Sequence, residues 1–205
     1  MPSRAGSASA LSLLLVLATA FPGRAEPIGQ VVAQRGAASA VRDGAPRALH
    51  LGARVEASDR IRTSAEGRVQ IAFADGSSLV LGPASELELT RFELRDGRLF
   101  AAVVELLSGI LRMQVPTAPL DVVEARGRTA IATVRGTEWI IETGAAKTAV
   151  FVLRGTVGVR GTAAGSAVSL HPGEGTDVPA GAPAPSPVRW GEARVREVLA
   201  LTAAQ

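Results

Sequence analysis

Several residue types are missing from this 205-residue sequence, and each absence excludes something. There is no cysteine, so neither a disulfide framework nor a lipid-modified cysteine is possible. Asparagine is also absent, which removes N-glycosylation and the common Asn-Gly hairpin turn. Tyrosine is absent too, and aromatic residues make up only 3% of the chain. The core must therefore be built mainly from valine, leucine, isoleucine and alanine.

The basic charge of the chain does not indicate a nucleic-acid partner. The sequence pI is about 10.8, but the formal net charge is only +3. Nearly all cations are arginine, with Lys147 the only lysine. Arg4 and Arg24 supply two of the three net charges, so removal of a leader that carries them leaves about +1. The other arginines are spread along the chain rather than clustered as a phosphate-binding face requires.

The first 25 residues have the pattern of a signal peptide. Arg4 precedes an apolar run, Leu11–Ala20, and Gly23-Arg24-Ala25 offers small residues at the positions that a signal peptidase reads. Ala18-Thr19-Ala20 is a second possible cleavage site. The alternative is an uncleaved anchor, but the apolar run is shorter than the roughly 20 residues that span a bilayer. We expect a periplasmic or secreted protein with no membrane span after cleavage.

The segment 67–82 has the clearest local pattern in the chain. Val69, Ile71 and Phe73 alternate with smaller or polar residues, as on a strand with one buried face. Asp75-Gly76 then supplies a turn, and Leu79 to Leu81 supplies a returning strand. This segment predicts a β-hairpin.

The remainder of residues 26–178 follows a similar pattern of short strands and glycine-marked turns. A phase slip near Arg91 predicts a bulge, and Arg135-Gly136-Thr137 predicts a turn. Leu99–Leu107 could be a strand or a short helix, because periodicity does not decide between them. Thr148–Leu153 is apolar on both faces, which predicts a central strand covered on both sides. We predict one all-β domain of many short strands, a β-roll, solenoid-like fold or sandwich.

The composition changes after residue 178, and residues 179–205 are predicted to form a linker and a short C-terminal helix. Pro179–Pro187 holds four prolines, which favours an extended linker. In the following segment, apolar side chains recur with helical spacing. This helix either packs back on the β domain or docks a partner. For the second case, the candidate partner contacts are Trp190, Arg196 and Leu199.

The sequence contains no pattern typical of an active site, so we expect no catalytic residue, cofactor or metal. The only histidines are His50 and His171, both beside predicted turns, and no zinc, nucleophile-elbow or phosphate-loop motif is present. Glu138 and Glu142 would be about 13 Å apart along a strand, too far for a glycosidase pair. Asp59 and Asp75 are better interpreted as turn residues.

An ordered series of short motifs resembles the FecR-like domain, the periplasmic domain of iron-citrate signalling regulators. The matching segments are Leu51-Gly52, Ser58–Thr63, Phe73–Ser77, Leu106–Ile110, Thr133–Trp139, Val152–Val157 and Leu170–Glu174. The resemblance covers about residues 29–178. Ser58 stands where the family usually has glycine, and Trp139 where phenylalanine is commoner.

The resemblance implies an all-β, non-enzymatic domain that acts through protein contacts. Regulators of this family carry a cytoplasmic anti-sigma segment and a membrane span ahead of the domain, whereas here only the predicted leader precedes it. We therefore expect an exported FecR-like interaction module with an unknown protein partner in the cell envelope. The alternative is an envelope scaffold or a protein that binds a cell-surface polymer, which would need exposed aromatic side chains.

Overall fold

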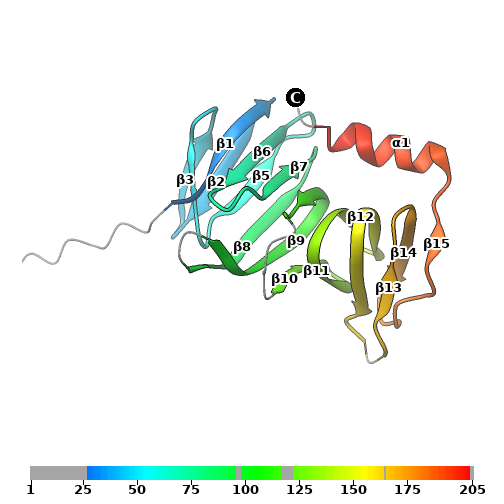
Figure 1. Ribbon diagram of the computed structural model, residues 1–205. Coiled ribbons are helices and arrows are strands. Elements are labelled where there is room, and N and C mark those ends of the chain that lie inside the picture. The colour runs from blue at the N-terminus through cyan, green and yellow to red at the C-terminus, as the bar shows by residue number, and fades with distance from the viewer. Residues whose placement is uncertain (1–26, 96–97, 117–121, 164, 204–205) are drawn as a thin grey trace, which may run out of the picture.

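The computed structural model describes residues 27–95, 98–116, 122–163 and 165–203, and they form fifteen strands and one helix (Figure 1). The predicted signal peptide and the predicted turn at Asp96-Gly97 lie outside the described residues. The strands are β1 (Pro27–Arg35), β2 (Ala38–Arg42), β3 (Ala45–Leu49), β4 (Arg54–Glu56), β5 (Arg60–Thr63), β6 (Arg68–Phe73), β7 (Ser78–Leu81), β8 (Glu86–Arg95), β9 (Arg98–Gln114), β10 (Val122–Arg126), β11 (Ala130–Thr143), β12 (Lys147–Gly161), β13 (Val168–Leu170), β14 (Glu174–Pro179) and β15 (Val188–Arg189), and the helix is α1 (Glu192–Leu201).

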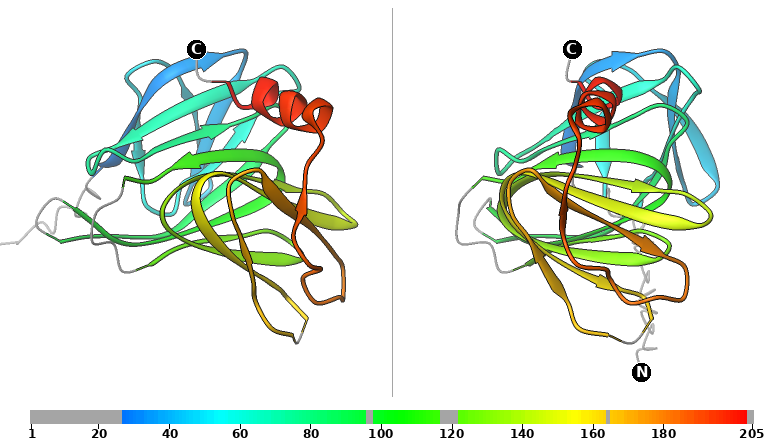
Figure 2. Two further views of the ribbon diagram at one scale, coloured as in Figure 1. Left: turned by 45° about the vertical axis from the view of Figure 1, so that its right-hand side comes forward. Right: turned by 90° about the vertical axis from the view of Figure 1, so that its right-hand side faces the viewer.

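All fifteen strands are hydrogen-bonded into one sheet, which folds over on itself to form two layers. Three long strands, β9, β11 and β12, contribute one half to each layer, and Figure 2 shows them, green to yellow, curving through the molecule. The first layer has the order β15-β14-β12-β11-β9-β7-β6-β1-β4. The second has the order β3-β2-β5-β8-β9-β10-β11-β12-β13. The all-β prediction is confirmed.

Each of the three shared strands bends at a glycine with a positive φ. The φ angles are 87° at Gly109 in β9, 61° at Gly136 in β11 and 87° at Gly155 in β12. A Cβ on Gly109 would lie 2.1 Å from the hydroxyl oxygen of Ser85, so the neighbouring chain also requires glycine there. The turn predicted at residues 135–137 is therefore wrong, because β11 continues through this point with a register shift.

Two buried hydroxyl side chains join the strands along this corner. Thr63 Oγ1 donates to the carbonyl of Gly82 over 2.6 Å and accepts from the backbone N–H of Ser85 over 3.0 Å. The Ser85 Oγ in turn accepts from the N–H of Ile110 over 2.9 Å. Backbone groups that the bend takes out of the strand ladder thereby keep hydrogen-bond partners.

A single hydrophobic cluster fills the space between the layers, and Trp139 is its largest fully buried side chain. The predicted hairpin is confirmed, because Ile71 pairs with Leu79 across β6 and β7. The predicted bulge in β8 is also confirmed by a register shift between Leu89 and Arg91. The ambiguous segment at residues 99–107 is strand, since it belongs to β9.

Helix α1 lies across the outer face of the first layer (Figure 1). It begins close to β14, where Arg194 pairs with Asp177, and it ends close to the corner after β7. At that end, a Cβ on Gly82 would lie 3.1 Å from the carbonyl oxygen of Leu201. The proline-rich segment before the helix also contacts the sheet, because Thr176 Oγ1 donates to the Pro185 carbonyl over 3.0 Å.

Candidate interaction surface

Trp190, the first of the three predicted contact residues, is packed against the first layer. It follows β15, is half-buried, and stacks on Phe151 of β12 with ring centroids 4.8 Å apart. The guanidinium carbon of Arg194 lies over the indole ring, 3.4 Å from the ring centroid. Both faces of the indole are therefore occupied, and Trp139 is fully buried. Neither tryptophan offers the open aromatic face that stacking on a polymer needs.

Arg194 also forms the strongest polar contact of α1 with the sheet. Its two terminal nitrogens donate to the two carboxylate oxygens of Asp177 on β14, over 2.7 and 2.6 Å. Lys147 Nζ donates to the same carboxylate over 2.9 Å. These hydrogen bonds, chiefly that from Arg194, lower the pKa of Asp177 to about 2. Arg194 was not predicted as a contact residue from the sequence; it lies in the first turn of α1, four residues after Trp190.

The other two predicted contact residues differ in their exposure. Leu199 is half-buried and packs with Val198 against Ile110 and Ile140, which point outward from β9 and β11. Arg196 is exposed and forms an ion pair of 3.2 Å with Glu192, one turn earlier. Trp190 and Leu199 thus attach the helix to the sheet, whereas Arg196 faces solvent. The prediction that residues 148–153 are covered on both sides is confirmed by the packing of Phe151 under Trp190.

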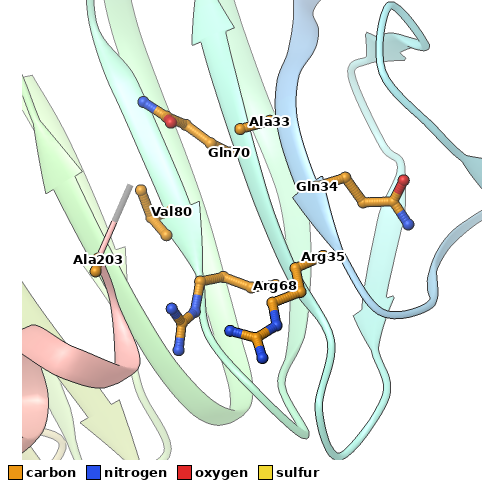
Figure 3. A pocket seen from close by; sticks show the side chains of 7 residues that line it. All are labelled: Ala33, Gln34, Arg35, Arg68, Gln70, Val80 and Ala203. Carbon is orange, nitrogen blue, oxygen red and sulfur yellow. The ribbon is translucent and has the colours of Figure 1, made fainter. Parts of the chain in front are cut away.

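Beyond the C-terminal end of α1, the outer face of the first layer carries two adjacent arginines (Figure 3). Arg35 of β1 lies directly opposite Arg68 of β6 in the strand register. Both border a cavity of about 10 Å³ that is also lined by Ala33, Val80 and Ala203. Within the described residues neither arginine forms an ion pair, and Arg68 Nε is shielded from solvent without a hydrogen-bond partner.

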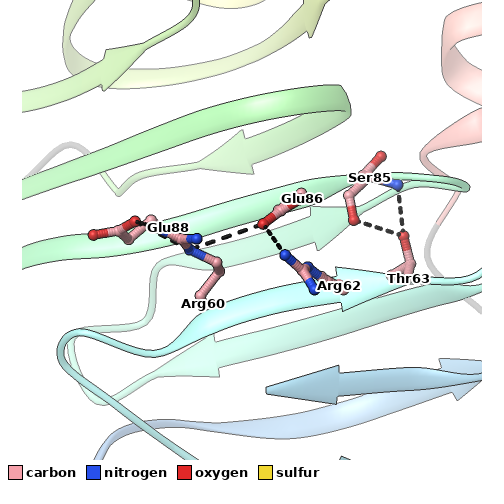
Figure 4. Close-up of polar contacts among 6 residues, drawn as sticks. All are labelled: Arg60, Arg62, Thr63, Ser85, Glu86 and Glu88. Carbon is pink, nitrogen blue, oxygen red and sulfur yellow. Dashed lines mark hydrogen bonds and ion pairs between the residues drawn. The ribbon is translucent and has the colours of Figure 1, made fainter. Parts of the chain in front are cut away.

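The outer face of the second layer has a different electrostatic character (Figure 4). Arg60 and Arg62 on β5 lie opposite Glu88 and Glu86 on β8. The ion-pair distances are 2.8 Å for Arg60–Glu88 and 2.8 Å for Arg62–Glu86, with a further contact of 3.8 Å between Arg60 and Glu86. Hydrogen bonding to Glu88 raises the pKa of Arg60. Positive and negative side chains on β5 and β8 therefore compensate one another.

The two predicted turn aspartates do hold turns. The carboxylate of Asp59 accepts the backbone N–H of Glu56 over 2.9 Å and pairs with Arg47, while burial raises the pKa of Asp59. Asp75 Oδ1 accepts the backbone N–H of Ser77 over 3.0 Å. Ser58 has a φ of 67°, a conformation that glycine adopts more readily than residues with a side chain.

Two hollows on the surface lie apart from α1. One, of about 440 Å³, borders β1 and β6 beside Gln30 and Phe73, and the other, of about 290 Å³, lies beside Arg42 and Arg60. His50 and His171 are both exposed. In the described part of the chain, no group of three or more histidine or acidic side chains is placed to hold a metal ion. The same residues include no helix long and apolar enough to cross a membrane.

Comparisons with known proteins agree with the fold. The sequence model of the family described as FecR protein matches residues 59–158. Two crystal structures of a candidate anti-sigma factor from Parabacteroides distasonis ATCC 8503 superpose with TM-scores of 0.57 and 0.56, at 20% identity over 68% of this chain. The chain spans 63% and 64% of those two chains, less than two thirds of their length. No curated protein matches the sequence.

Proposed function

The chain is a FecR-like domain protein, and we propose that it works as an exported, non-enzymatic protein-interaction module in cell-envelope signalling. The observation that carries this proposal is the position of α1. The helix lies outside the matched residues 59–158 but is attached across the outer face of the domain that they form. An added helix held in one place on a β domain offers a partner a rigid surface whose ordering cost has already been met during folding.

The three candidate contact residues have two different roles in the proposed interaction. Trp190 and Leu199 hold the helix on the sheet through Phe151 and through the apolar cluster. Arg196 lies on the exposed side of the helix, opposite the buried Val198, and this side would meet the partner.

Site-specific photo-crosslinking in the living cell tests this proposal. A photo-reactive amino acid at position 196 should capture one envelope protein as a discrete product identified by mass spectrometry. The same amino acid at position 62, on the second layer, is the matched control and should capture none of it. Equal capture at both positions, or polymer at position 196, would favour an envelope scaffold instead.

Export needs a separate measurement, because the predicted signal peptide is a sequence-based expectation. The mature protein isolated from the periplasm or the medium should begin at Glu26, or at Phe21 if the earlier site is used. A cytoplasmic protein that retains Met1 would overturn this part of the proposal.

A further inference from the structure

We propose that Arg35 and Arg68 form a receptor site for an acidic side chain, aspartate or glutamate, on the protein partner. The inference deepens the proposed function and rests on it, because it names the chemistry of the partner. It starts from the juxtaposition of two guanidinium groups on β1 and β6 (Figure 3).

Among the described residues, no acidic side chain forms an ion pair with Arg35 or Arg68, in contrast to Arg60 and Arg62 on the second layer. Side chains directly opposite each other in an antiparallel pair are about 5 Å apart, and like charges at that position repel. Glu66 lies two residues before Arg68 but forms no ion pair with either arginine in the described structure. Within the described residues, the C-terminal end of α1, which leads to Ala203 beside the pair, offers about half of one negative charge. An incoming anion would therefore relieve a repulsion that the fold leaves in place.

The two arginines also retain unused hydrogen-bonding capacity. A guanidinium carries five N–H donors in a planar fork that matches a carboxylate. In the described structure, Arg68 Nε has no hydrogen-bond partner and the Arg35 side chain donates no hydrogen bond. Two adjacent guanidinium groups can therefore donate hydrogen bonds to one carboxylate from both sides.

The shape of the site favours a macromolecule over a free anion. The adjoining cavity of about 10 Å³ is close to the smallest space that holds one water molecule, so a small ligand would remain on the surface. Free ligands bind in concave sites that bury most of their surface. The surroundings here are a strand face with the uncharged side chains of Gln34, Gln70 and Ala33. Two arginines on such a face are also too few for the phosphate backbone of a nucleic acid.

The site can be tested with the full chain and a defined probe. Backbone amide shifts are recorded by NMR while hexaglutamate peptide, hexaglutamine peptide or inorganic phosphate is added. Hexaglutamate should shift the amides of residues 33–36 and 68–70 saturably, whereas hexaglutamine and phosphate should not. The double variant R35Q/R68Q should weaken hexaglutamate binding at least tenfold. The matched control R160Q removes an exposed arginine from the second layer and should change the affinity by less than twofold.

The midpoint of thermal unfolding distinguishes a binding role of the arginine pair from a structural role. If the pair serves binding, R35Q without any ligand should raise the midpoint of thermal unfolding, because a repulsion disappears. No shift with hexaglutamate, equal binding by R35Q/R68Q, or equally strong shifts with phosphate would overturn the inference. If crosslinking at position 196 still captures the partner under any of these outcomes, the interaction module stands and only the acidic site fails.

Discussion

The outer faces of the two layers share the long strands β9, β11 and β12, but they differ in how their outward side chains are covered and paired. On the first layer, outward apolar residues such as Ile140 and Phe151 are covered by α1 and Trp190. Among the described residues, Arg35 and Arg68 on the same layer have no acidic partner. On the second layer, Arg60 and Arg62 are matched with Glu88 and Glu86 across neighbouring strands.

This difference indicates which face a protein partner can cover with a favourable change in electrostatic free energy. A compensated face loses existing ion pairs when another surface excludes water from it, so binding there starts with a cost. An uncompensated arginine pair gains a charge-assisted contact instead. Helix α1 ends beside Arg35 and Arg68 and adds a rigid surface there. Complementary charge then contributes specificity and association rate more than affinity.

The largest expected effect comes from a substitution at the bend where β12 passes from one layer to the other. Gly155→Ala forces a side chain into positive φ, and its Cβ would meet Thr137 Cγ2 at 2.7 Å and the Gly136 carbonyl at 2.9 Å. We expect a loss of about 3 kcal/mol in the free energy of unfolding, measured by urea denaturation. Gly158→Ala in the same strand is the control, since its nearest neighbour would be 3.8 Å away. Equal losses for both variants would show that the bend at Gly155 is not what holds the layers.

The next effect is confined to the first layer. Trp190→Ala removes the stack on Phe151 and the contact with Arg194, so we expect a loss of about 2 kcal/mol, less than for a fully buried tryptophan. Hydrogen exchange should rise over residues 192–201 and stay unchanged in β5 and β8. Arg196→Ala, on the exposed side of the helix, should change the stability by less than about 0.5 kcal/mol. Faster exchange throughout the sheet would mean that α1 is part of the core.

Acidic pH should reduce the contribution that Asp177, on β14 of the first layer, makes to the free energy of unfolding. The pKa of Asp177 is about 2 in the folded protein, below the ordinary 3.8, so its ionised form stabilises the fold above pH 4. That contribution is lost as the pH falls from 4 towards 2. Because the carboxylate is about one third exposed, solvent screening reduces the contribution to about 1 kcal/mol. Asp177→Asn should remove this pH dependence, measured by denaturation at each pH, whereas Asp43→Asn on the exposed turn after β2 should retain it.

The local elements of this fold could be predicted from sequence because their signals are local. Alternation around Ile71 and the turn at Asp75-Gly76 specify a hairpin whatever surrounds them. The bends at Gly136 and Gly155 could not be predicted as bends. A glycine that ends a strand and one that lets a strand turn a corner differ only in which distant strands pair on either side.

The candidate site shows the same limit. Helical spacing identified Leu199, which packs on the sheet, but spacing does not reveal that Phe151 and Asp177 lie beneath the helix start. The pairing of Arg35 with Arg68 joins residues 33 positions apart and depends on the register of β1 against β6. Register is set by tertiary packing, so no short motif could have indicated this pair.

The smallest effects test the electrostatic contrast itself, and they should have opposite signs. A double-mutant cycle on Arg62→Gln and Glu86→Gln should give a coupling of about 0.5 kcal/mol that stabilises the fold. Arg35→Gln should instead stabilise the protein by a few tenths of a kcal/mol, because it removes a repulsion and sacrifices no ion pair. Both effects should shrink in about 1 M salt, where the Debye length falls to about 3 Å. If Arg35→Gln destabilises the protein at low salt, the pair is held by contacts within the fold, and the contrast between the two faces disappears.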